Sequence, residues 1–427
     1  MSFAEFLQSP QVTINWAVQW CDIAISKFRQ FGILANCWTP ADSHHYEVDR
    51  WLVEDQVKRY VKVARYSSGH LSNRDDRLVY VVLRLDAYLS IMTGRPPILR
   101  FQEIRIPLPV SEDLWNEPSH ESRLRLHWTQ PAGRAKLNFN NLMRQGLLSI
   151  GPMKLPLQLS LEDYHFGLCA LQSELWTVTQ ETRYHDHRTY KNPSISSYEE
   201  VRVWYNYLLE WRNHVEQNHH LENNFFANDP VPPSGESFNH GNAALNLTLY
   251  HISAINLFAN VHLLETSKCC AECTEADISH RIQAWTQTPS GRHAVLHAAQ
   301  IQRVHECEYA KSSSIGSAPR IVTNPLSPTG LLMSAVVICM YGIRSSGCPS
   351  CSTARPLDDE TVELAQPGTE TSGACQYWVE NGGSAIVNGL PLCLCSVPKL
   401  STWYCDRLKG SPAHEQRLIR FLLGLKA

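Results

Sequence analysis

The chain contains 427 residues, of which 43% are hydrophobic and 19% are charged, proportions that are ordinary for a water-soluble globular protein. Its formal net charge of -3 provides no basic field for phosphate groups, so we do not expect it to bind nucleic acid. The N-terminal residues MSFAEFLQSP lack the pattern of a secretory signal, and no run of eighteen apolar residues occurs. We therefore expect no membrane span and a cytoplasmic location.

Apolar residues recur at helical spacing along most of the chain, whereas strand patterns are scarce. Spacing and flanking breakers predict helices at about 12–32, 47–66, 75–93, 160–184, 198–218, 242–268, 275–286, 291–311, 327–344 and 412–425. The alternating stretch IRIPLPV (104–110) contains two prolines and is predicted to be an extended loop. The sequence thus predicts an all-α, multi-helix protein, with residues 1–427 forming a single domain.

Segments rich in proline, glycine and serine are predicted to be loops at 229–237, 312–328 and 345–374. The last of these contains a polar stretch that we expect to be flexible. This segment also contains the CxxC motif CPSC (348–351), whose cysteines we expect to be loop or core residues rather than ligands of a four-ligand zinc site. Cys169 and Cys339 lie in apolar helical runs, so we expect mostly reduced thiols.

The predicted helix LNLTLYHISAINLFANVHLLETSK (245–268) has a polar stripe on an otherwise apolar surface. The stripe comprises Asn246, Tyr250, Ser253, Asn256, Asn260, Leu264, Ser267 and Lys268. A buried amide without partners costs on the order of 1 to 3 kcal/mol, so these side chains must meet polar groups, water, a metal ion or a ligand.

Carboxylates that could bind a metal ion occur in the predicted helix at 160–188. Ser160 and Asp163 have the spacing of a capping box, which favours a structural role for Asp163. Glu174 and Glu181 share a face with small residues, as expected of either a cavity wall or a solvated surface. The run that follows, His185 to His187, is better explained as a polar helix end, because consecutive residues diverge around the helix axis.

Residues 51–115, which include RLDAYLSIMTGRPP and LPVSEDLW, resemble the regulatory domain of fungal-specific transcription factors. The likeness continues through LTLYHISAINLF and WTQTPSGRHAVLHAAQI. It implies a helical fold in which Asp86, Arg95 and Pro96 are structural. Such regulators carry a zinc module that reads DNA ahead of this domain. No such module is seen in this sequence, so a regulator of this type would act through partners.

A second resemblance is to atypical fungal terpene cyclases, the humulene synthases of tropolone sesquiterpenoid biosynthesis, which were once classed as regulators. These enzymes bind farnesyl diphosphate with magnesium and an essential lysine, preceded one turn earlier by an apolar residue. Lys268 and Leu264 have this spacing. The resemblance implies that Lys268 is catalytic and that Mg²⁺ is the cofactor.

Under this interpretation, the isoprenoid substrate would contact Leu264, Asn256, Asn260 and Tyr250. The metal ion would be bound by Glu174 and Glu181. The DDxxD and NSE signatures of other terpene cyclases are absent, as are a GxSxG elbow and a phosphate-binding glycine loop. The missing zinc module and the spacing of Leu264 and Lys268 lead us to predict a cyclase that converts farnesyl diphosphate to a humulene-type sesquiterpene. The alternatives are a regulatory or effector-binding protein without a DNA-binding module and a metal-independent cyclase or isomerase.

Overall fold

A computed structural model describes residues 10–35, 71–109, 138–148, 159–188, 195–227, 240–266, 274–313, 324–344, 361–366, 368–409 and 411–424. Contacts divide the chain into two compact units, Met1–Ser173 and Glu174–Ala427, which are considered separately. Within the described residues the structure is helical, apart from three short strands. The predicted all-α class is confirmed, and the single domain stays a prediction. The predicted helix at 47–66 lies outside the described residues.

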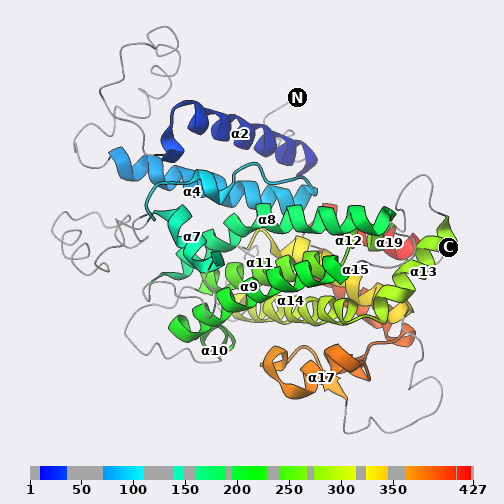
Figure 1. Ribbon diagram of the computed structural model, residues 1–427. Coiled ribbons are helices and arrows are strands. Elements are labelled where there is room, and N and C mark those ends of the chain that lie inside the picture. The colour runs from blue at the N-terminus through cyan, green and yellow to red at the C-terminus, as the bar shows by residue number, and fades with distance from the viewer. Residues whose placement is uncertain are drawn as a thin grey trace. The chain divides into compact units, whose positions relative to one another are not determined.

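The first unit consists of α-helices and short 3-10 helices (Figure 1). Its elements are α2 (Pro10–Gln30), η1 (Ile33–Ala35), α4 (Leu71–Thr93), η3 (Phe101–Glu103), α7 (Phe139–Leu148) and the start of α8 (Leu161–Arg188). Helix α2 packs against α4. The predicted capping box begins α8, because Ser160 N donates to Asp163 Oδ2 (2.8 Å) and Asp163 N donates to Ser160 Oγ (3.2 Å).

The chain that follows α4 is held by the buried carboxylate of Asp86. Its Oδ2 accepts hydrogen bonds from the backbone N–H groups of Ile98 (2.7 Å) and Leu99 (2.9 Å). Its Oδ1 accepts from Arg95 Nη2 at 2.9 Å, and Arg95 also reaches Asp22 at 2.9 Å. Asp86 therefore fixes the extended segment after the helix, which is the structural role expected of it.

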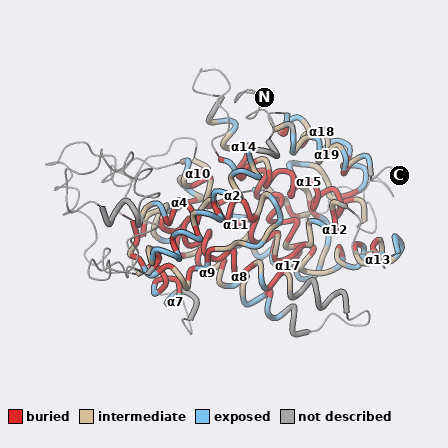
Figure 2. The backbone as a smooth tube through the Cα atoms, turned by 90° about the horizontal axis from the view of Figure 1, so that it is seen from above, coloured by how far each residue is buried: buried red, intermediate tan, exposed pale blue. Residues whose placement is uncertain are grey.

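The second unit has a core of three long helices, α11, α14 and α15. The helices of this unit after α8 are α9 (Ile195–His219), α10 (Leu221–Phe226), α11 (His240–Phe258), α12 (Val261–Thr266), α13 (Glu275–Thr286), α14 (Pro289–Ser313), α15 (Ser327–Arg344), α17 (Gly373–Asn381), α18 (Val397–Leu408) and α19 (Pro412–Gly424). Helix α14 contacts both α11 and α15, and α9 lies along α11 (Figure 1). Figure 2 shows the burial of these core helices.

The strands form one small sheet in the second unit, in the order β1, β2, β3. They are β1 (Val362–Glu363), β2 (Ala385–Val387) and β3 (Leu390–Pro391). Strands β1 and β2 pair in parallel, and β2 and β3 pair antiparallel. Between β1 and β2 the chain forms η5 (Thr369–Thr371) and α17. The segment predicted as a loop at 345–374 therefore includes β1, η5 and the start of α17, and its flexibility stays a prediction.

The predicted continuous helix at 242–268 is wrong, because the helix is interrupted at Ala259 and Asn260. Asn260 Oδ1 accepts a hydrogen bond from Leu263 N at 3.2 Å, which begins α12 as a separate helix. Asparagine competes for backbone donors in this way and is favoured at helix starts. The polar stripe is thus divided between two helices.

Helix α15 is, among the described helices, the one that is long and apolar enough by composition to cross a membrane, with a mean hydropathy of 1.3. However, 83% of that stretch is buried inside the protein. Its neighbours include α14, α18 and α19. This is the pattern of a core helix.

Because two buried histidines have lowered pKa values, we expect the free energy of unfolding to fall in acid. Burial lowers the pKa of His165 to about 3 and that of His305 to about 4, both below the unfolded value of 6.5. The unfolded chain then binds protons that the folded chain excludes, so stability is fully present above pH 6.5 and falls as the pH drops toward the folded values. Over this range, each histidine should lower the free energy of unfolding by roughly 1.4 kcal/mol for each pH unit of acidification.

Urea unfolding measured between about pH 7 and about pH 5 checks this expectation. His305 also accepts or donates a hydrogen bond with Ser327 Oγ at 2.8 Å, so the conservative change His305→Gln is the informative variant. We expect His305→Gln to be less stable at neutral pH but less sensitive to acid. An unchanged pH dependence in this variant would contradict the assignment.

Candidate functional site

The second unit contains a buried cluster of charged and aromatic side chains, and Glu370 lies at its centre. Glu370 is on η5, which follows a turn at Gly368 with a φ of 67°, a left-handed conformation that favours glycine. After η5, Ser372 caps α17 by accepting a hydrogen bond from Cys375 N at 3.2 Å. The turn and the cap fix the position of the Glu370 backbone between them.

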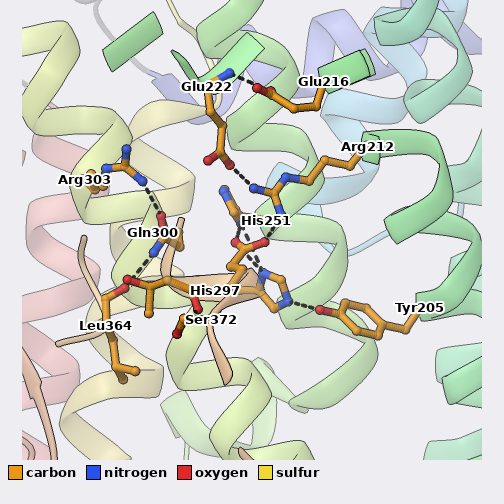
Figure 3. Close-up of polar contacts among 12 residues, drawn as sticks. Tyr205, Arg212, Glu216, Glu222, His251, His297, Gln300, Arg303, Leu364 and Ser372 are labelled. Atoms are coloured by element: carbon orange, nitrogen blue, oxygen red, sulfur yellow. Dashed lines mark hydrogen bonds and ion pairs between the residues drawn. The ribbon is translucent and has the colours of Figure 1, made fainter. Parts of the chain in front are cut away.

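The Glu370 carboxylate pairs with Arg212 of α9. The guanidinium of Arg212 also pairs with Glu222 (Figure 3). Burial lowers the pKa of Arg212, but the Glu370 charge acting together with Tyr250 and Tyr205 outweighs burial and raises it. Burial raises the pKa of Glu370, while the cations of Arg212 and Arg303 oppose this. Because the guanidinium bonds Glu370 Oε2 directly, we treat the two side chains as a buried ion pair.

Two imidazoles face the other oxygen of Glu370. His251 of α11 and His297 of α14 approach each other with their Nδ1 atoms 3.1 Å apart. These atoms lie 3.3 Å (His251) and 3.6 Å (His297) from Glu370 Oε1. Burial lowers the pKa of both histidines well below its usual value, so both rings are neutral near pH 7. Three potential ligand atoms therefore converge, which is the donor set of nitrogen- and oxygen-liganded metal sites.

Aromatic rings surround the two histidines. The Tyr205 hydroxyl lies 3.2 Å from His297 Nε2. Figure 3 draws this contact as a dashed line. The Tyr205 ring packs edge-on against Phe258, with ring centroids 4.8 Å apart. The Tyr250 ring lies 5.3 Å from the guanidinium carbon of Arg212, in cation–π contact. Burial raises the pKa of both phenols, so both carry their protons.

A separate group of hydrogen bonds holds the segment between β1 and η5 against α14. Gln300 Nε2 donates to the backbone oxygen of Leu364 at 2.6 Å (Figure 3). Arg303 Nη1 donates to Gln300 Oε1 at 3.1 Å and to the backbone oxygen of Gln366 at 3.3 Å. Helix α14 therefore both contributes a histidine to the cluster and anchors the chain that carries Glu370.

Of the predicted substrate contacts, only Tyr250 is placed in this cluster. Leu264 is buried in α12, and Asn256 is half-buried near the end of α11. Asn260 is also half-buried, and its side-chain oxygen caps α12. The substrate roles of these residues stay predictions.

The predicted catalytic and metal-binding residues lie partly outside the described structure. Glu174 is half-buried in α8. Glu181 lies in the same helix, but its side chain is outside the described part of the structure, as is all of Lys268. The CPSC motif at 348–351 also falls outside the described residues, as do the side chains of His185 to His187. Their proposed roles therefore stay predictions.

The central members of the cluster were not predicted from the sequence. His251 had a usable signal, because it is an ionisable residue within the most apolar part of its helix, LTLYHISAI. His293 and His297 are one helical turn apart, which also draws attention to α14. Glu370 gave no such signal, since its segment resembles a solvated loop. Seven of the described cysteines carry free thiols, as expected, whereas Cys395 is disulfide-bonded.

Comparison with known proteins identifies one family. Residues 71–188 match the fungal specific transcription factor domain. The matched segment covers less than half of the chain and includes α4, α7 and α8. It therefore includes Asp86 and Arg95, which carried the resemblance in the sequence. No curated protein and no solved structure matches the chain.

Proposed function

We propose that the chain is a regulatory or effector-binding protein of the fungal-specific transcription factor type. The observation that carries this proposal is the family match over residues 71–188. The buried contacts of Asp86 support it, because they hold the segment that carries the resemblance. With a net charge of -3, the chain is expected to act through protein or small-molecule partners in the cytoplasm, without binding DNA directly.

A transcriptional reporter tests this function. The full chain is fused to an unrelated DNA-binding domain in a fungal host, and reporter output is compared with that of the DNA-binding domain alone at equal protein abundance. A regulatory protein should raise or lower the output. Equal output from a stable, abundant fusion would oppose the proposal.

A second candidate function is cyclisation of farnesyl diphosphate to a humulene-type sesquiterpene with Mg²⁺. The spacing of Leu264 and Lys268 favours it, and the burial of Leu264 suits a residue that contacts an apolar chain. Ionisation of the diphosphate needs cations near the leaving group and a dry cavity for the carbocation. Incubation of the purified protein with farnesyl diphosphate and Mg²⁺, followed by gas chromatography, tests this function directly.

If the chain is a cyclase, changes at Lys268 and Leu264 should have different effects. Lys268→Ala removes a cation that offsets diphosphate charge, and we expect turnover to fall by roughly 10² to 10³. Leu264→Met should preserve turnover and alter the product mixture by reshaping the apolar wall. Lys409→Ala is the control, because Lys409 is an exposed lysine paired with Asp406. Full activity in Lys268→Ala would remove this lysine from the mechanism.

The magnesium dependence of the same reaction tests the predicted metal ligands. Mg²⁺ prefers carboxylate oxygens, so replacing Glu174 and Glu181 together by glutamine should raise the Mg²⁺ concentration needed for half-maximal turnover. We expect a shift of at least about tenfold, from the loss of two charged ligands. An unchanged magnesium requirement would place the metal-binding carboxylates elsewhere in the chain.

A further inference from the structure

We propose that His251, His297 and Glu370 bind one divalent transition-metal ion of the zinc type. The proposal rests on the geometry of the second unit and is independent of the regulatory and cyclase functions. The three residues come from α11, α14 and η5, so a bound ion would join two core helices to the segment that follows β1.

The first support is the size of the triangle formed by the three ligand atoms. Its sides are the 3.1 Å between the two Nδ1 atoms and the 3.3 Å and 3.6 Å from these atoms to Glu370 Oε1. The point equidistant from all three atoms is about 1.9 Å from each, so an ion slightly out of the plane has the roughly 2.0 to 2.1 Å bonds of zinc sites. The side chains need little movement to bind it.

The second support is a buried oxygen for which the described residues provide no well-oriented donor. Within the described structure, Glu370 Oε1 has no hydrogen bond of acceptable geometry, although the atom is buried. The two imidazole Nδ1 atoms lie 3.3 Å and 3.6 Å from it. An uncompensated carboxylate oxygen in a protein interior is costly, and a metal ion at the centre of the triangle would compensate it.

The third support comes from the hydrogen-bond partners of the ligand side chains. When His297 Nδ1 binds a metal, its Nε2 carries a proton and donates to the Tyr205 hydroxyl, 3.2 Å away. The second oxygen of Glu370 accepts from Arg212. Metal-binding histidines and carboxylates usually have such partners, which fix the tautomer and the orientation of the ligand.

The donor types select the class of ion. Imidazole nitrogen suits Zn²⁺ and other late transition ions, whereas Mg²⁺ and Ca²⁺ prefer sites made only of oxygen ligands. The site is therefore chemically distinct from the magnesium site that a cyclase would use. Three protein ligands leave one position of a tetrahedral ion for water or another small ligand.

Cobalt binding to the metal-free wild-type protein tests the proposal, with Co²⁺ as a spectroscopic substitute for Zn²⁺. Protein treated with a chelator and kept reduced is titrated with Co²⁺. We expect one ion per chain and a visible d–d spectrum of tetrahedral type. The intense near-ultraviolet band of thiolate ligands should be absent, which distinguishes this site from binding by the cysteines. Zn²⁺ should displace the cobalt, and excess Mg²⁺ should not.

Three variants place the bound ion. His297→Gln and Glu370→Gln each replace one ligand while keeping its approximate size, and we expect each to weaken binding by more than about 100-fold. Tyr205→Phe removes the hydroxyl that contacts His297 and Tyr250 but keeps all three ligands, and we expect binding to weaken by roughly 10- to 100-fold. The matched control is His305→Gln, which changes another buried histidine of α14 outside the cluster and should leave the affinity unchanged.

Folded wild-type protein that binds no Co²⁺, or binds it only with a thiolate band, would overturn the proposal without reference to any variant. Retention of the tetrahedral spectrum in folded Glu370→Gln and His297→Gln would also overturn it. Amide hydrogen exchange gives a second measurement that does not depend on the cobalt spectrum. Zn²⁺ should slow exchange in the η5 segment of the wild type, and equal exchange with and without the ion would count against the site.

Discussion

Replacing Arg212 by methionine should destabilise the second unit by about 3 to 5 kcal/mol, the usual effect of breaking a buried ion pair from one side. Arg212 pairs with Glu370 and Glu222, and its side chain is only 11% exposed. Methionine fills part of the space but leaves both carboxylates without their cation. Chemical denaturation followed by circular dichroism measures the change.

A matched control lies on the same helix. Arg202 pairs with Glu199 at 3.9 Å, and both side chains are more than half exposed. Arg202→Met should therefore change stability by less than about 1 kcal/mol. Adding Glu370→Gln to Arg212→Met should restore part of the lost stability, because it removes the unpaired charge. Equal effects of Arg212→Met and Arg202→Met would show that the buried pair has no special role.

Replacing Asp86 by alanine should destabilise the first unit by a similar amount, about 3 to 5 kcal/mol. The substitution leaves the backbone N–H groups of Ile98 and Leu99 without their acceptor. It also removes one of the two carboxylates on Arg95. Thermal and urea unfolding measure the loss.

Asp22→Ala is the control for this change. Asp22 is the other carboxylate paired with Arg95, but its side chain is 45% exposed. The backbone N–H groups of Ile98 and Leu99 donate to Asp86 and not to Asp22. We expect this variant to lose less than about 1 kcal/mol. If Asp22→Ala were as destabilising as Asp86→Ala, the stability would come from the ion pairs with Arg95 rather than from the backbone hydrogen bonds to Asp86.

Helical periodicity predicted the long helices well, because each has a broad apolar surface that packs in the core. The helix at 275–286 has the predicted bounds, and α15 also runs over the predicted 327–344. Helix α18 was missed, although Val397, Leu400, Tyr404 and Leu408 are buried at helical spacing. The break at Asn260 was missed because a single side chain caps α12, and an average over many residues does not detect that contact.

The candidate site was much less predictable than the fold. The sequence correctly marked the apolar helix with its polar stripe as unusual, and Tyr250 from that stripe does lie in the cluster. Glu370 is 119 residues from His251 and 73 from His297, so only the tertiary fold brings their side chains together. A polar segment before a helix gives no local indication that one of its carboxylates will be buried.

The most direct test of the proposed regulatory function is the reporter output of the full chain fused to an unrelated DNA-binding domain, measured at matched protein abundance. We predict that the wild-type fusion changes transcription relative to the DNA-binding domain alone. We also predict that Asp86→Ala, which weakens the unit that carries most of the family match, reduces this change. A wild-type fusion that is folded and abundant, yet gives the same output as the DNA-binding domain alone, would contradict the regulatory function.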